Sequence, residues 1–307
     1  MEFFKKRTKI PFMRMKVRAF SFSILLIISS IIAIMYYGVA LSLDFTGGTQ
    51  VELSFPESTS IDKIRSVLQE SQQISLQAIG GSKQFLVRIP YSKHSPSQTE
   101  LRKKIKLRLP YAKITNLTYI GPQIGAALLL DGVNAMAIAL LCTMFYIALR
   151  FETRFAFSAL VALLHDPIIT MGVFALFQYE FDIISLAGVL TILGYSLNDT
   201  IVVYDRVREN FQQHPNMSCG DIVDLAINDT LSRTIITSGL TLLAVLSLCL
   251  FAGQALWGFS LALAIGIVVG TYSSIYVAGA LSVVLGLSAD HLLGSKQQLT
   301  PRLVMEE

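Results

Sequence analysis

Residues 19–40 read AFSFSILLIISSIIAIMYYGVA, a run of 22 residues without an acidic, basic or histidine side chain. A helix needs about 20 apolar residues to cross the hydrocarbon of a bilayer, so this run predicts a membrane-spanning helix. Of the 307 residues, 53% are hydrophobic and only 15% are charged, against about 25% charged in average soluble domains. The sequence therefore predicts an α-helical membrane protein with six transmembrane helices. The other five runs lie at 126–149, 155–177, 183–204, 234–252 and 257–285.

The segment 42–123, between the first two spans, has the pattern of a small soluble domain. Alternating apolar residues predict four strands, and two amphipathic stretches that begin with serine or threonine predict helices. The order strand–helix–strand–strand–helix–strand is that of a ferredoxin-like α+β domain (βαββαβ). Gly80-Gly81 is expected to form a turn. We expect strands at 51–55, 74–79, 85–89 and 112–120, and helices that begin at 58–60 and 95–97.

Lysine and arginine in the short flanks of the spans predict the orientation. The first 18 residues are basic, and so are the connections after the second and fourth spans, whereas the turns 178–182 and 252–257 contain no Lys or Arg. A cleaved signal peptide ending near Ala40 is the alternative for the first span, but the apolar run exceeds the usual ~7–15 residues, which favours a retained helix. The expected layout is a cytoplasmic N-terminus at 1–18, a first transmembrane helix at 19–41, a periplasmic ferredoxin-like domain at 42–123, a five-helix transmembrane bundle at 124–286 and a cytoplasmic tail at 287–307.

The sequence shows no group of residues typical of an enzyme. Its three cysteines and four histidines lack metal-ligand spacing, and 42–123 contains no nucleophile with a base. We expect no catalysis, no cofactor and no metal. The basic cluster Arg102-Lys103-Lys104 is interpreted as a solvated helix face, with anionic lipid headgroups or an acidic partner as the alternative. Nucleic acid is not an expected partner across a membrane.

Ionisable residues inside the spans are the most informative feature. Such a side chain costs about 2.5–3.5 kcal/mol at mid-bilayer on insertion scales, so its presence indicates a function. Asp166 lies about 16 Å from the start of its span, and Asp199 lies about 7 Å from the cytoplasmic end of its own. Arg233 can extend its head to the depth of Asp199, although Arg206 is a competing partner on the same helical face. A motion that alternately wets Asp199 and pairs it would load and release a proton; the alternative is a static network that fixes helix packing.

The sixth span carries small residues at every fourth position. Such a ridge allows close approach of helix backbones. It predicts a packing surface, either within the bundle or toward a second subunit. The ridge consists of Gly258, Ala262, Gly266, Gly270, Ser274, Ala278 and Ser282.

Four stretches carry a resemblance that covers nearly the whole chain. They are LDFTGGT at 43–49, LHDP at 164–167, GYSLNDTIVVYDR at 194–206 and LSRTIITS at 231–238. Together they resemble the SecF family, subunits of the bacterial Sec protein-export accessory complex. The resemblance implies the resistance-nodulation-division superfamily, in which six spans pair with six spans of SecD in the bacterial inner membrane.

The resemblance also implies a role for individual residues. Asp199, next to Asn198 in the Asn-Asp-Thr motif, and Arg233 match the proton-coupling residues of the family, and Asp166 matches an acid of its third span. A step driven by the proton motive force would assist translocating polypeptides beside the SecYEG channel and the SecA motor, with the lipid bilayer as the surrounding medium. The DFTGG stretch implies a hinge at the membrane exit, formed by Asp44, Gly47 and Gly48, because two glycines permit a tight turn where the domain swings.

Two other functions remain open at this stage. A proton-coupled small-molecule exporter of the same superfamily usually has twelve spans and two large external domains in one chain, whereas this chain has half of that. A structural scaffold of a translocase would not need polar residues at matched depth. An enzyme that uses Asp166 and Asp199 as an acid pair is disfavoured, because no nucleophile, metal or cofactor motif accompanies them.

Overall fold

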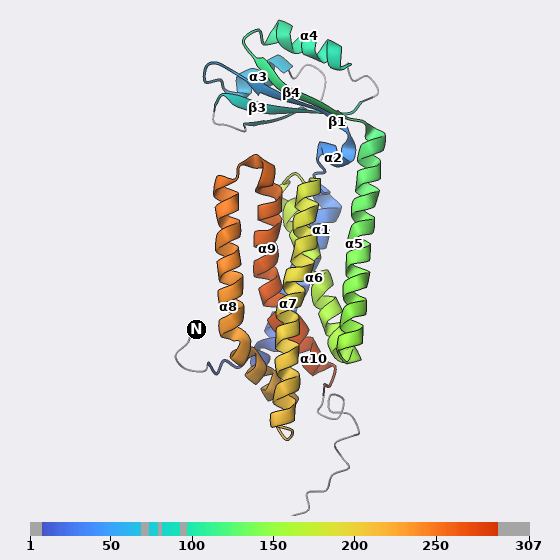
Figure 1. Cartoon of the computed structure of the whole chain (residues 1–307), viewed down its shortest axis with the longest axis vertical. Coiled ribbons are helices and arrows are strands. Elements are labelled where there is room, and N and C mark those ends of the chain that lie inside the picture. The colour runs from blue at the N-terminus through green and yellow to red at the C-terminus, as the bar shows by residue number, and fades with distance from the viewer. Residues whose placement is uncertain (1–7, 69–73, 79–81, 93–96, 288–307) are drawn as a thin grey trace, which may run out of the picture.

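The computed structural model describes residues 8–68, 74–78, 82–92 and 97–287. Within this part of the chain, six helices are long and apolar enough to cross a membrane, so the predicted six-span architecture is confirmed. They stand side by side as an elongated bundle with the small sheet domain at one end (Figure 1). The six are α1 (Lys16–Tyr37, preceded by the 3-10 turn Phe12–Met15), α5 (Pro122–Arg150), α6 (Thr153–Phe177), α7 (Ile183–Gln213), α8 (Cys219–Phe251) and the segment formed by α9 (Trp257–Ser273), a π-helical turn (Ser274–Gly279) and α10 (Ala280–Val284).

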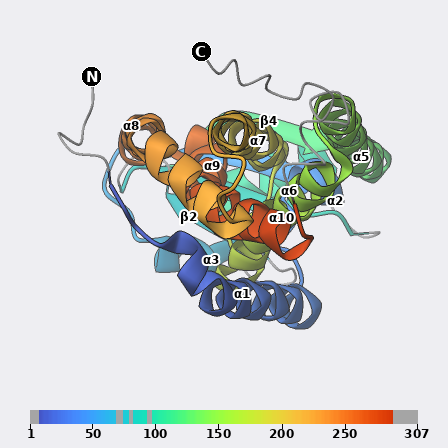
Figure 2. The same ribbon diagram turned by 90° about the horizontal axis from the view of Figure 1, so that it is seen from below.

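The helices of the bundle differ in how deeply they are buried. About half of the residues in the apolar windows of α6, α7 and α9 are buried, against less than a fifth in α1, α5 and α8. Viewed along the bundle, α6 and α9 lie among the other helices (Figure 2). Because lipid is as apolar as leucine, close contact between such helices depends on small residues. Ala159 and Ala162 of α6 and Ala262 of α9 are accordingly almost fully buried.

The external domain has the predicted ferredoxin-like topology. Its sheet has the strand order β2-β3-β1-β4 with all neighbours antiparallel, the arrangement of a split βαβ unit. Ser97 caps α4 in a reciprocal capping box with Glu100, and Val51 and Leu53 of β1 contribute to the core. The expected Gly80-Gly81 turn lies outside the described residues. The elements are β1 (Gly48–Ser54), α3 (Ile61–Leu68), β2 (Ser75–Ala78), β3 (Gln84–Pro90), α4 (Gln98–Arg108) and β4 (Lys113–Ile120).

The two helices of the domain cover one face of its sheet. The side chains of Phe85 and Val87 on β3 pack with Leu101 and Ile105 of α4, and α4 lies on the side of the sheet away from the bundle (Figure 1). The alternate residues of β3 therefore face the outer end of the bundle. Arg88 is one of them.

A short segment joins α1 to β1 and is held tightly. Ser42 caps the one-turn helix α2 (Leu43–Thr46), and Gly47 and Gly48 follow with φ values of 74° and 146°. A Cβ atom on Gly47 would lie 2.7 Å from the backbone Cα of Pro122, the first residue of α5. The glycine pair thus forms a tight turn against α5, whereas a swing of the domain about this turn stays a prediction.

We expect Gly47→Ala to destabilise the subunit more than Gly38→Ala does. Both glycines have positive φ, a conformation that costs a residue with a Cβ about 1–2 kcal/mol. Only Gly47 adds a clash with backbone, because nothing lies within 4 Å of a Cβ on Gly38. Thermal unfolding of the purified variants measures the difference. Equal melting temperatures would show that the contact with Pro122 is not tight.

Candidate functional site

Asp166 lies at the centre of a buried network in the middle of α6. The residue is fully buried. Ser196 of α7 donates a hydrogen bond to Oδ2 at 2.5 Å, and Ser273 of α9 donates to the same oxygen at 3.0 Å. The Nδ1 atom of His165 lies 2.9 Å from Oδ1. The carboxylate thus joins α6, α7 and α9, and its polar atoms are satisfied inside the protein, as burial requires.

The small-residue ridge of α9 allows this helix, which carries Ser273, to lie close to Ser196 and Asp166. A Cβ on Gly270 would lie 3.1 Å from Cβ of Ser196 and 3.4 Å from Oδ2 of Asp166. A Cβ on Gly266 would overlap Ile192, and one on Gly258 would overlap Ser185. The ridge therefore packs against α7 within this chain, which answers the question that the sequence left open. Ala262 and Ser274 of the ridge are also buried.

Asp199 occupies a second polar site, one turn further along α7 than Ser196. It is 4% exposed. Ser238 of α8 donates to its Oδ2 at 3.4 Å, and Thr271 of α9 donates to the Ser238 hydroxyl at 3.0 Å. Asp199 is therefore held by one long hydrogen bond, whereas Asp166 has three close partners.

The two arginines that could pair with Asp199 lie elsewhere. Arg206 makes ion pairs of 2.6 Å with Asp229 of α8 and with Glu209. Arg233 is exposed on α8; its charge acts on Asp199, but among the described residues no ion pair within 4.0 Å includes it. Asn198 is also exposed on the outside of α7. The structure thus brings Asp199 together with hydroxyls and not with an arginine.

The hydroxyl partners of Asp166 and Asp199 are difficult to predict from the sequence. Serine and threonine are common in membrane helices and bond their own backbone, so residue type alone does not distinguish Ser196, Ser238, Thr271 and Ser273. Ser196 and Ser238 lie in two of the quoted stretches, and Ser196 lies one turn before Asp199. His165 is 1% exposed, and its Nε2 atom has no partner among the described residues.

The residues around the predicted hinge contact the start of α7. Oδ2 of Asp44 accepts a hydrogen bond of 3.3 Å from the backbone N–H of Ile183, the first residue of that helix. The ring of Phe45 stacks on Phe181 with centroids 6.2 Å apart. The linker is thus fixed to the start of the helix that carries Asp199.

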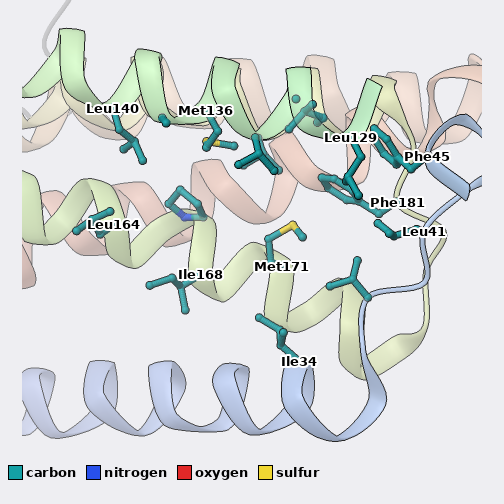
Figure 3. Close-up of a pocket in the computed structure, with 17 residues that line it drawn as sticks. Ile34, Leu41, Phe45, Leu129, Met136, Leu140, Leu164, Ile168, Met171 and Phe181 are labelled. Atoms are coloured by element: carbon teal, nitrogen blue, oxygen red, sulfur yellow. The ribbon is translucent and has the colours of Figure 1, made fainter. Parts of the chain in front are cut away.

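An apolar pocket of about 710 Å³ opens behind this linker, between α1, α5, α6 and α7. Phe45, Phe181 and Leu41 lie at one end, with Met136 and Met171 further along the helices (Figure 3). Its walls hold no ionisable side chain. Within the described residues, no cluster of three or more His, Cys, Asp or Glu residues has the arrangement of a metal site.

Comparison with known proteins identifies relatives of this chain. Residues 101–288 match the family described as "Protein export membrane protein SecD/SecF, C-terminal", and residues 37–55 match the "SecD/SecF GG Motif". The chain is 41% identical to protein translocase subunit SecF of Vibrio alginolyticus, with 94% of each chain covered. It is 39% identical to the SecF subunit of Escherichia coli O157:H7, with 94% of this chain and 92% of that protein covered.

A solved structure gives the same result. The crystal structure of SecDF from Thermus thermophilus, a translocon-associated membrane protein, superposes with a TM-score of 0.81 and 33% sequence identity. The match covers 93% of this chain and 39% of that longer chain. The family model, the related sequences and the solved structure therefore show that this chain belongs to the SecD/SecF family of protein-export membrane proteins.

Proposed function

We propose that this chain is a SecF-type subunit that converts proton movement through its bundle into assistance for protein export. The export role follows from the family and from the SecF relatives, which match over almost their whole length. The observation that carries the proton-coupling role is Asp199, a carboxylate buried in a membrane helix with a single long hydrogen bond. The proposal assigns no enzymatic reaction to the chain.

The unequal environments of the two carboxylates support different roles. Desolvation favours the neutral form of a carboxylic acid, and hydrogen bonds to the carboxylate favour the charged form. Asp166 has three close polar partners on three helices, so we assign it a fixed position in the relay. Asp199, with one donor, is the group whose surroundings change most when a helix shifts.

Arg233 supplies the positive charge that pairs with Asp199 after the proton has left. It is exposed on α8, and its long side chain can reach along the helix. We infer a second state in which Arg233 pairs with Asp199 after the carboxylic acid has released its proton. Arg206 is the weaker candidate for this pair, because Asp229 and Glu209 already hold its guanidinium.

The family supports a proposal for the partners and the location of the chain. SecDF is the name of the solved relative, so we propose a SecD-type subunit as the direct partner; the exposed Asn198 and Arg233 mark α7 and α8 as one contact face. We further propose the inner membrane of a bacterium, both termini in the cytoplasm and residues 42–123 in the periplasm. There the domain would meet translocating polypeptides near SecYEG and SecA.

Asp199→Asn tests the proposed function. Asn retains the shape of the side chain and one oxygen that can accept the Ser238 hydrogen bond, but it cannot exchange a proton in the physiological range. We expect maturation of a secreted protein to fall to the level of cells without the subunit, while the variant still assembles with its SecD-type partner. Asp131→Asn is the matched control, because Asp131 is exposed on α5. Normal export by the Asp199→Asn variant would make the scaffold function the better explanation.

The fixed position assigned to Asp166 is tested at Gly270. We expect Gly270→Val to lower the free energy of unfolding by about 1–3 kcal/mol, the usual cost of overpacking, because the new side chain displaces Ser196 and Asp166. Gly239→Val on α8 is the control, since nothing lies within 4 Å of a Cβ there. Thermal unfolding in detergent gives the comparison. The assignment fails if both variants melt at the same temperature.

A further inference from the structure

One charged side chain ties the external domain to the outer end of the bundle. Arg88 of β3 forms an ion pair with Glu180, which lies in the loop between α6 and α7. The Arg88 guanidinium also donates to the side chain of Gln77 at 3.3 Å, and Ser75 of β2 donates to Glu180 at 3.4 Å. The face of the sheet that carries no helix is thus held over the loop that leads into α7.

Two further carboxylates surround the same guanidinium. Burial lowers the pKa of Arg88, and the negative charges of Asp182 and Asp44 act in the opposite direction. Asp182 caps α7 by accepting from the Ser185 N–H at 2.6 Å. Asp44 accepts from the Ile183 N–H. Both alternative partners of Arg88 are therefore attached to the start of α7, Asp182 as its N-cap and Asp44 through the hydrogen bond from Ile183, whereas Glu180 precedes the helix.

The space around Arg88 allows the guanidinium to change partner. Two polar pockets, of about 300 and 260 Å³, are both lined by Arg88 and Asp182. Glu180 lines the first pocket, and Asp44 lines the second. Neither set of acids is sealed in a packed core, so exchange between them does not require a core to open.

The helix that receives these contacts also carries the proton site. Asp199 lies sixteen residues beyond Ile183 on α7, which corresponds to about 24 Å along an unbroken helix. A displacement of α7 at Asp199 therefore also moves Ile183 and Asp182. It changes their distance from Arg88 on the external domain.

We propose that Arg88 is the positioning residue that transmits the movement of α7 to the external domain, by exchanging between Glu180 and the carboxylates of Asp182 and Asp44. This inference rests on the proposed proton-coupled export function. It adds a two-state element whose equilibrium both the bundle and the domain can bias. Export requires the exchange, whereas proton entry at Asp199 does not.

The test uses the full chain in complex with its SecD-type partner, with two readouts. Export is followed as maturation of a secreted protein, and proton uptake is followed with a pH-sensitive dye in membrane vesicles. We expect Arg88→Gln to lower export at least about fivefold, the lower end of coupling between sites, with proton uptake unchanged. Arg88→Lys keeps the charge and is expected to stay within about twofold of the wild type. Arg102→Gln, on the exposed face of α4, is the control for loss of one positive charge.

The charge-reversed pair Arg88→Glu with Glu180→Arg separates exchange from a fixed tie. The reversed pair restores docking of the domain, measured as normal hydrogen exchange of residues 178–183, but a glutamate at position 88 is repelled by Asp182 and Asp44. We expect export to stay as low as in Arg88→Gln. Full export by the reversed pair, or by Arg88→Gln alone, would overturn the proposal. Loss of proton uptake in Arg88→Gln would overturn it too, because Arg88 would then act on the bundle itself, whereas Asp199→Asn reports separately on the proton site.

Discussion

Water is excluded from the middle of a lipid bilayer, so every polar group there has to find its partner within protein. This constraint decides how the bundle is put together. Asp166 on α6 needs donors, and they come from Ser196 on α7 and Ser273 on α9. Because both serines reach the same carboxylate oxygen, α7 and α9 have to lie close together, and the glycines of α9 make that distance possible. The buried acid needs donors from α7 and α9, and the ridge of small residues allows these helices to come close enough to supply them.

The second acid meets the same requirement less completely, and this difference carries the functional argument. Several strong donors stabilise a carboxylate in one position and one protonation state. A carboxylate with a single long hydrogen bond can change its protonation state or its partner at lower cost. Among the described residues, only Ser238 donates a side-chain hydrogen bond to Asp199. Its nearest basic residue on α8, Arg233, stays outside the bundle. A site with an unfinished set of partners is a suitable place for a proton to enter and leave.

Much of this architecture could be predicted from the sequence, and the limits have physical causes. The apolar runs predicted six spans because hydrocarbon thickness sets helix length, and the period-two pattern predicted the strands of the external domain. The predicted fifth span begins at 234, whereas α8 begins at Cys219. The first half of α8 is helical but too polar to continue the apolar run from which the span was predicted. That half brings Asp229 beside Arg206, which removes Arg206 as a partner of Asp199. The pair Arg88–Glu180 joins residues far apart in sequence, and no local pattern indicates it.

The connection between the domain and the bundle has one rigid part and one adjustable part. The rigid part is the linker, where Gly47 lies against Pro122 and Phe45 stacks on Phe181. Packed contacts of this kind move as a unit, since interiors are dense and do not deform continuously. The adjustable part is Arg88, which lies between three carboxylates and beside open space. If α7 shifts, the linker moves with the helix. The ion pair that Arg88 forms then determines how the sheet tilts relative to the linker. This arrangement allows the domain to change its inclination without losing its attachment, as the proposed transmission through Arg88 requires.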